Sequence, residues 1–214
     1  MSIQVEGHKR ELLHLGWPCI PGEIIWNDIE PSKLGFYNFG DKPYPIYIQR
    51  HALQRLTERL NILPGLIHEG TSEALKPGTV KWQRYNEKSL IPLFIFDKKL
   101  GYLVISCQEE YIIVRSFLFL TNNGTPEGNK LTEPTKLAPL DKKHLDVDNL
   151  NGFAAYNFGA DPDLSNLFKD AGCRDLLEVG DLLKFSEGIS KAKNPGQLME
   201  YLTAHAKDDH TLGI

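Results

Sequence analysis

The feature that most limits the fold of this 214-residue chain is a series of four strand-like runs near its middle. The runs are Thr79–Tyr85, Leu90–Asp97, Leu100–Cys107 and Tyr111–Leu120. The links between them are short and polar: Asn86–Lys88, Asp97–Lys99 and Gln108–Glu110. Links of this length allow hairpins but not crossovers, so we expect a four-stranded antiparallel meander. Pro92 cannot donate a backbone hydrogen bond, so it must lie at a strand start or on a free edge.

Two short helices are expected before the meander. Residues Arg50–Leu60 contain no Gly or Pro, and Pro64 prevents their continuation. Residues Pro64–Leu75 form the second candidate, with Pro64 in its first turn. In the first helix the 3.6-residue period places Leu53, Leu56 and Leu60 on the core face.

The segments on either side of this α+β part have different patterns. Residues 1–45 contain five prolines and several large apolar side chains, so we expect an ordered lead-in with a short helix near Glu6–Leu15. Residues 137–214 predict an additional acidic helical C-terminal region. Its candidate helices are Leu140–Leu150, Asp163–Ala171, Asp175–Phe185 and Pro195–Ala206. The sequence therefore predicts three parts, 1–45, 46–136 and 137–214, in a chain of the α+β class.

Charge is distributed unevenly along the chain. The net charge is −4, but residues 42–136 hold 13 Lys/Arg against 9 Asp/Glu. Residues 1–41 hold 3 against 6, and residues 137–214 hold 8 against 13. A basic middle between acidic flanks is typical of polyanion-binding modules, and it also arises by chance.

The cysteines and the apolar runs indicate a cytoplasmic protein. Cys19, Cys107 and Cys173 form no CxxC pair, which favours a reducing compartment. No run of 18 apolar residues is present, and the N-terminus lacks a signal-peptide pattern, so we expect no membrane partner. His51, His68 and Cys107 lack the spacing of zinc ligands, so we expect no metal and no other cofactor.

Three basic residues occupy one side of the first expected helix. At about 100° per residue, His51, Arg55 and Arg59 form a stripe that borders the apolar face. Two arginines at i and i+4 repel each other by a few tenths of a kcal/mol, which an anion near them would relieve. Alternatively, the arginines only lay their stems along the core edge and pair with acids such as Glu58.

The last strand adds a fourth basic residue. In Tyr111–Thr121 we assign the even positions, which include Ser116 and Leu118, to the core face. Arg115 then lies on the other face of a strand that is otherwise apolar. It must reach a partner or water, because an unpaired buried charge is costly. Either a carboxylate such as Glu109 or a substrate phosphate would satisfy it.

A helix with the pattern His-x-x-x-Arg-x-x-x-Arg, a second short helix and a meander resemble a known group of enzymes. These are the small toxin-type domains of the barnase–EndoU–colicin–RelE superfamily of metal-independent ribonucleases. The matched positions are His51, Arg55 and Arg59 with the meander Thr79–Leu120. The resemblance implies endoribonuclease activity, with His51 as acid or base and Arg55 and Arg59 as the phosphate clamp. Arg115 is the candidate for the second catalytic basic residue.

Two other functions fit the same residues. The basic residues could bind nucleic acid or a protein without chemistry, or they could brace the fold of an accessory structural protein of a mobile element. The expected partners are RNA and an inhibitory protein. Catalysis requires His51 in a cleft with two cations, binding requires only the charge, and bracing requires each arginine to pair with Asp or Glu.

Overall fold

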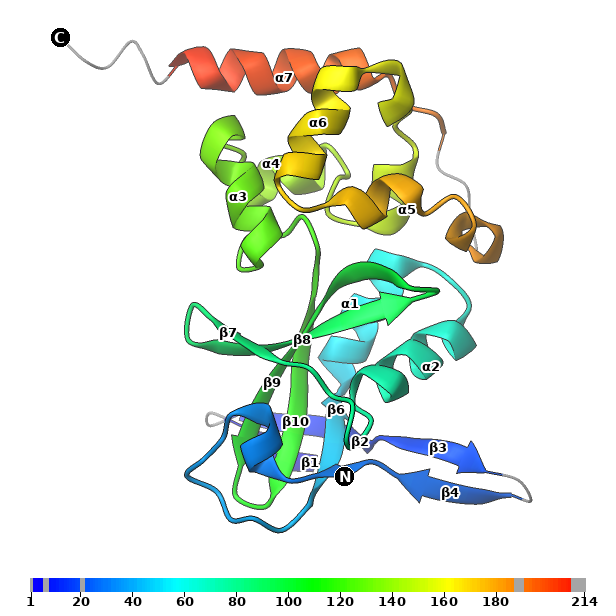
Figure 1. Cartoon of the computed structure of the whole chain (residues 1–214), viewed down its shortest axis with the longest axis vertical. Helices are drawn as coiled ribbons and strands as arrows, with labels where there is room; N and C mark the ends of the chain where they lie inside the picture. Colours follow the sequence, from blue (N-terminus) through cyan, green and yellow to red (C-terminus); the bar gives the residue numbers. More distant parts are fainter. Residues whose placement is uncertain (1, 6–7, 20–21, 187–190, 209–214) are drawn as a thin grey trace, which may run out of the picture. The chain divides into compact units, whose positions relative to one another are not determined.

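The computed structural model describes residues 2–5, 8–19, 22–186 and 191–208, and the chain has the predicted α+β fold (Figure 1). The chain divides into two compact units. Unit 1 consists of Met1–Glu58, Pro64–Ile95 and Tyr102–Leu118, and unit 2 consists of Arg59–Leu63, Phe96–Gly101 and Phe119–Ile214. The three-part division at residues 45 and 136 stays a prediction about independently folding domains. Among the described residues, no helix is long and apolar enough to cross a membrane.

The largest sheet has eight strands in the order β1–β2–β6–β10–β9–β8–β7, with β5 also paired to β6. The strands are β1 (Ser2–Val5), β2 (His8–His14), β5 (Asp28–Ile29), β6 (Tyr44–Gln49), β7 (Gln83–Tyr85), β8 (Lys88–Ile95), β9 (Lys98–Gln108) and β10 (Tyr111–Phe119). The last four form the predicted antiparallel meander, which is confirmed. A separate hairpin joins β3 (Gly16–Cys19) to β4 (Glu23–Trp26).

Strand β6 makes the sheet mixed, which the sequence did not reveal. It pairs in parallel with β10, with Ile46 opposite Ile112. Strand β2 pairs with the other side of β6. The helix expected near Glu6–Leu15 is therefore wrong, since residues 8–14 form a strand. Glu, Lys and Leu favour helices only weakly, and pairing with β6 overrides that local preference.

Strand β8 confirms the expectation for Pro92. Strand β7 pairs with β8 only between Lys88 and Leu90. Pro92 lies beyond this pairing, where β8 has no β7 neighbour to receive a hydrogen bond. A proline is tolerated there because its missing N–H would have no acceptor on that side.

Helices α1 (Arg50–Leu60) and α2 (Pro64–Ala74) lie beside the strands (Figure 1). Leu56 and Leu60 are fully buried, as predicted. Leu53 is 37% exposed, so its assignment to the core is wrong. The buried stripe instead includes Ala52, at i, i+4 and i+8 with the two leucines, and Leu53 lies at its border. Helix α2 packs closely on β8, because a Cβ at Gly70 would lie 3.0 Å from the carbonyl oxygen of Phe94.

Unit 2 contains the predicted helical C-terminal region. Its helices are α3 (Pro126–Thr135), α4 (Pro139–His144), α5 (Leu150–Ala154), α6 (Pro162–Asp170) and α7 (Pro195–Asp208), with 3-10 turns at Phe158–Ala160, Arg174–Glu178 and Leu182–Phe185. Phe153, Phe158 and Phe168 form an aromatic cluster with ring centroids 4.5–5.1 Å apart. The sequence missed α3, which starts with Thr125 as its N-cap.

Lys142 of α4 is a buried cation within unit 2. Its side chain is only 1% exposed. Its Nζ donates hydrogen bonds to the backbone oxygens of Thr121 and Gly128, both at 2.8 Å, and to Thr132 Oγ1 at 2.9 Å. All three protons of the ammonium therefore have acceptors. Burial lowers the pKa of Lys142 to about 8.

Candidate functional site

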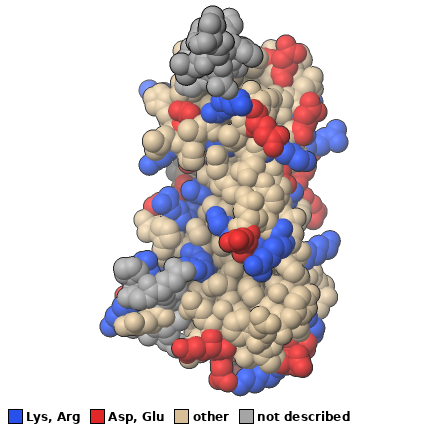
Figure 2. Space-filling view, turned by 90° about the vertical axis from the view of Figure 1, so that its left-hand side faces the viewer, with Lys and Arg blue, Asp and Glu red and all other residues tan. Residues whose placement is uncertain are grey.

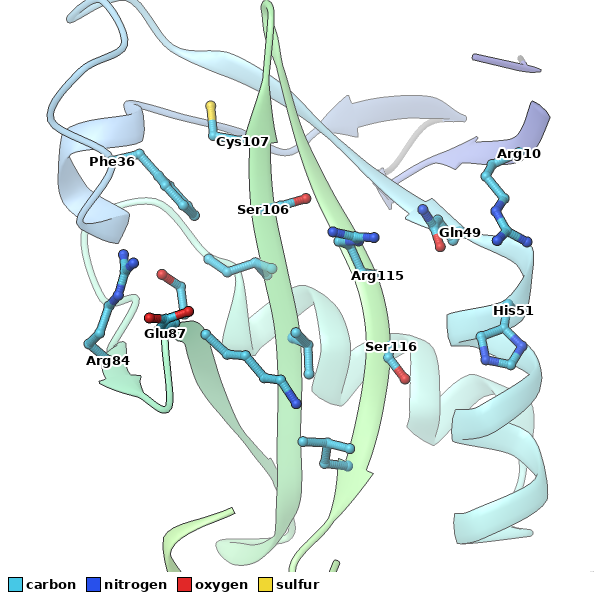
Figure 3. A pocket seen from close by; sticks show the side chains of 15 residues that line it. Arg10, Phe36, Gln49, His51, Arg84, Glu87, Ser106, Cys107, Arg115 and Ser116 are labelled. Carbon is cyan, nitrogen blue, oxygen red and sulfur yellow. The ribbon is translucent and has the colours of Figure 1, made fainter. Parts of the chain in front are cut away.

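A cavity of about 750 Å³ lies entirely within unit 1 (Figure 3). Its walls come from β2, β6, β7, β8, β9 and β10, from the start of α1, and from the segment around Phe36. Cavities of this size are typical of sites that bind small ligands. Its lining combines polar and apolar side chains, and its cations come from segments far apart in the sequence.

The register of three strands brings four of the lining residues together. In the parallel pair of β6 and β10, Ile48 lies opposite Val114, so Gln49 and Arg115 come next on neighbouring strands. In the antiparallel pair of β2 and β6, Leu12 lies opposite Gln49. Beyond Gln49 the chain enters α1, where an ion pair of 2.7 Å between Glu11 and Arg50 keeps the neighbouring residues Arg10 and His51 near each other at the cavity wall.

The β7–β8 hairpin supplies the opposite side of the cavity. Arg84 and Ser89 are cross-strand partners and both line it. Glu87 lines it from the turn that joins the two strands, and Lys88 lines it from the first position of β8. The cavity thus contains four permanent cations, Arg10, Arg84, Lys88 and Arg115, against the single carboxylate of Glu87. Among the described residues, no acidic side chain forms an ion pair with Arg10, Arg84 or Lys88.

Consecutive residues of β10 contribute to the cavity. Arg115 and its neighbour Ser116 both line it. Leu118 also lines the cavity, whereas Phe117 is fully buried. The assignment of Ser116 and Leu118 to the core is therefore wrong. Both side chains are only half-buried, whereas Phe117 and Phe119 on the other face are fully buried.

Three buried polar atoms in the cavity wall lack hydrogen-bond partners among the described residues. They are Gln49 Nε2, Ser89 Oγ and Ser106 Oγ. Gln49 and Ser89 are 7% and 3% exposed. Buried polar groups are almost always paired in native proteins, and an unpaired one costs about 1–3 kcal/mol. These three atoms have almost no accessible surface, so a ligand in the cavity would pair with them only after the side chains turn toward it.

His51 lies at the cavity wall, as catalysis would require. Its Nε2 atom accepts a hydrogen bond of 3.5 Å from Arg55 Nε. Arg55 also pairs with Glu58 at 3.7 Å. Because Arg55 can only donate, this contact leaves the proton of a neutral imidazole on Nδ1.

The two arginines of the expected clamp have other positions. Arg55 and Arg59 are not among the described residues that line the cavity. Arg59 belongs to unit 2, where its Nη1 donates a 3.1 Å hydrogen bond to Asn122 Oδ1. Of the four candidates from the sequence, the structure places His51 and Arg115 in the same cavity, with Arg55 next to His51.

The lining also contains Cys107, which is 9% exposed. Burial raises the pKa of Cys107 to about 11, so its thiol stays protonated at neutral pH and is a poor nucleophile. Within the described ranges, no three His, Cys, Asp or Glu side chains lie close enough together to hold a metal ion.

Sequence reasoning missed Arg10, Gln49, Arg84, Lys88, Phe36 and Ser89. Local patterns could not find Arg10 or Gln49, because their place depends on the pairing of β2 and β10 with β6. The distribution of charge along the sequence indicated only that residues 42–136 are basic. On the face that Figure 2 displays, Lys and Arg side chains are interspersed with Asp and Glu. That face has no continuous basic surface.

Comparisons of the chain with protein-family models, with curated proteins and with solved structures found no match.

Proposed function

We propose that this protein binds RNA through phosphate groups in the cavity of unit 1. The main support is the surplus of cations in the cavity, four against one carboxylate, beside the unpaired amide nitrogen of Gln49. Guanidinium, ammonium and amide groups all donate hydrogen bonds, and phosphate oxygens accept them. The cations are spread over several strands, which suits a polymer with successive phosphates better than a single small anion.

Salt dependence is the direct test of phosphate binding. Each neutralised phosphate of a single strand releases counterions and adds about −0.7 to the slope of log Kobs against log salt. Three phosphate contacts would give a slope of about −2, so affinity should fall about 15-fold between roughly 50 and 200 mM salt. Fluorescence anisotropy with a single-stranded oligoribonucleotide of mixed sequence measures both values.

Charge-removing variants identify the cations that bind. We expect Arg10→Gln and Arg115→Gln to weaken binding and to reduce the steepness of the salt dependence by about 0.7 each. Arg174→Gln is the matched control, since Arg174 is exposed and belongs to unit 2. If wild type does not bind RNA, or binds it with no dependence on salt, the basic residues more simply serve to brace the fold.

Cleavage is the second candidate function, because His51 lines the same cavity as Arg115. In this reaction the 2′-hydroxyl oxygen attacks the adjacent phosphorus and the bond to the 5′-oxygen breaks, which leaves a cyclic phosphate. An unprotonated ring nitrogen of His51 accepts the proton of the 2′-hydroxyl, and the 5′-oxygen takes a proton from solvent. Arg115 and Arg10 stabilise the added negative charge of the transition state. Arg55 is a positioning residue, because it contacts His51 and not the cavity.

Cleavage has its own test. A mixed-sequence RNA should be cut in the presence of EDTA, and DNA of the same sequence should stay intact because it has no 2′-hydroxyl. His51→Ala should lower the rate by about 10²–10⁴-fold and leave binding nearly unchanged. If wild type binds but does not cleave, the protein is a binding module. A requirement for a divalent metal ion would contradict the resemblance to metal-independent ribonucleases.

A further inference from the structure

Phe36 is a fixed aromatic ring in the wall of the basic cavity. It is half-buried, and it packs edge to face on Phe39 with ring centroids 6.3 Å apart. Its backbone N–H donates a 3.0 Å hydrogen bond to the carbonyl oxygen of Pro31. The preceding Gly35 has a φ of 80°, and a Cβ there would lie 2.1 Å from a ring atom of Trp82. The ring of Trp82 therefore packs directly against this backbone and holds Phe36 in place.

The cavity has two chemically different sides. Figure 3 shows Arg10, Gln49 and His51 along one side and Phe36 and Arg84 along the other. The side with His51 offers a phosphate the guanidinium group of Arg10, and none of these three labelled residues is acidic. The side with Phe36 also contains the carboxylate of Glu87, which a phosphate would avoid.

The two serine hydroxyls of the cavity wall can form hydrogen bonds with ligands other than anions. Ser89 and Ser106 line the cavity, and their Oγ atoms are buried in its wall without partners among the described residues. A hydroxyl both donates and accepts, whereas a phosphate oxygen only accepts. The edges of nucleobases contain donors and acceptors side by side. A base next to Phe36 could donate to the carboxylate of Glu87, which a phosphate could not do, and could pair with either hydroxyl once that side chain turns toward the cavity.

From these contacts we infer that the cavity binds one unstacked nucleobase against the face of Phe36, with the adjoining phosphate on the side of Arg10 and Arg115. The ligand class is then single-stranded nucleic acid, as opposed to a duplex or a polyanion without bases. Bases inside a duplex are stacked and offer no free face, whereas splayed bases of single strands stack on aromatic side chains. This inference rests on the proposed phosphate binding and adds a base subsite to it.

Three probes test the subsite: a short single-stranded oligoribonucleotide, the same ribose-phosphate chain without bases, and inorganic polyphosphate. Wild type should bind the base-bearing strand about 5- to 100-fold more tightly than the abasic strand. Phe36→Leu should remove most of this preference and leave the salt slope unchanged, because it alters no charge. Arg115→Gln should weaken the binding of all three probes.

Tyr37→Leu is the matched control, because Tyr37 is the next residue in the chain and is 74% exposed. It should bind all probes as wild type does. Salt-sensitive binding of equal strength for base-bearing and abasic strands would overturn the base subsite and leave phosphate binding intact. No binding of any probe would overturn both. If Phe36→Leu fails to fold, the wild-type comparison of the first two probes still decides the outcome.

Discussion

The two units differ in how their buried polar groups are paired. In unit 2, the buried ammonium of Lys142 donates hydrogen bonds to three acceptors. In unit 1, the buried hydroxyl of Ser89 and the buried amide nitrogen of Gln49 have no hydrogen-bond partner among the described residues. Seven buried side-chain atoms of unit 1 lack a hydrogen-bond partner among the described residues, and three of them belong to residues that line the cation-rich cavity. The buried ammonium of Lys142 thus serves the folding of unit 2, whereas the polar groups in the cavity wall keep unused hydrogen-bonding capacity.

The largest stability effect should come from Lys142. Lys142→Met keeps most of the side-chain volume but removes the three hydrogen bonds. Leaving buried acceptors unpaired costs about 1–3 kcal/mol each, partly offset by the relief of burying a charge, so we expect a loss of about 2–3 kcal/mol. The measurement is the free energy of unfolding from a denaturant melt. Lys143→Met is the control, because Lys143 is exposed and should change stability by less than about 0.5 kcal/mol.

The pH dependence of stability provides the next test. The pKa of Lys142 is about 8 in the folded chain and 10.5 when exposed to water. Between these values the unfolded chain binds a proton that the folded chain has lost, so the stability of the folded chain rises with pH. Below pH 8 both states are protonated and the burial cost is fully present. Wild type should therefore gain about 1–2 kcal/mol relative to Lys142→Met between about pH 7.5 and 9.5. An equal pH dependence in both proteins would show that Lys142 does not titrate in this range.

Much of the fold could be predicted because its signals are local. The spacing of short apolar runs determined the meander, and the 3.6-residue period identified Leu56 and Leu60. Strand β2 and the parallel pair of β6 with β10 were missed because they depend on contacts between residues far apart in the sequence. Helix α3 was missed because Asn122–Gly128 is rich in turn-forming residues, although Thr125 caps a helix there.

The difference between local signals and long-range contacts also explains which site residues could be predicted. His51 was a candidate because a titratable residue lay on the border of an apolar helix face. Arg115 was a candidate because it interrupts an apolar strand. Arg10 and Phe36 had no such local sign, and only the sheet register and the packing of Trp82 on Gly35 bring them to the cavity. A cavity lined by many segments is a property of the tertiary structure.

A smaller loss of stability is expected when the N-cap of α3 is removed. Thr125 Oγ1 accepts a 2.9 Å hydrogen bond from the backbone N–H of Gly128 and donates to the carbonyl oxygen of Leu120 at 2.8 Å. Thr125→Ala removes both, and we expect a loss of about 1 kcal/mol or somewhat more in a denaturant melt. Thr57→Ala, at an exposed position of α1, should be neutral or slightly stabilising, because Ala is the better helix former. A neutral Thr125→Ala would show that buried polar groups of unit 2 contribute less to folding than their geometry indicates.

The smallest effect on stability, and the sharpest test of the comparison, is expected for Ser89→Ala. The hydroxyl of Ser89 is buried without a partner, so its removal breaks no hydrogen bond and ends an uncompensated burial. The free energy of unfolding should stay within about 0.5 kcal/mol of wild type or rise. RNA affinity should nevertheless fall several-fold, because a hydrogen bond between the hydroxyl and the ligand contributes about 1 kcal/mol. If Ser89→Ala instead loses as much stability as Thr125→Ala, the hydroxyl already has a partner within the protein. The difference in pairing of buried polar groups between units 1 and 2 would then not hold at Ser89. If both the stability and the RNA affinity are unchanged, Ser89 does not contact RNA, and binding is due to the cations and Gln49.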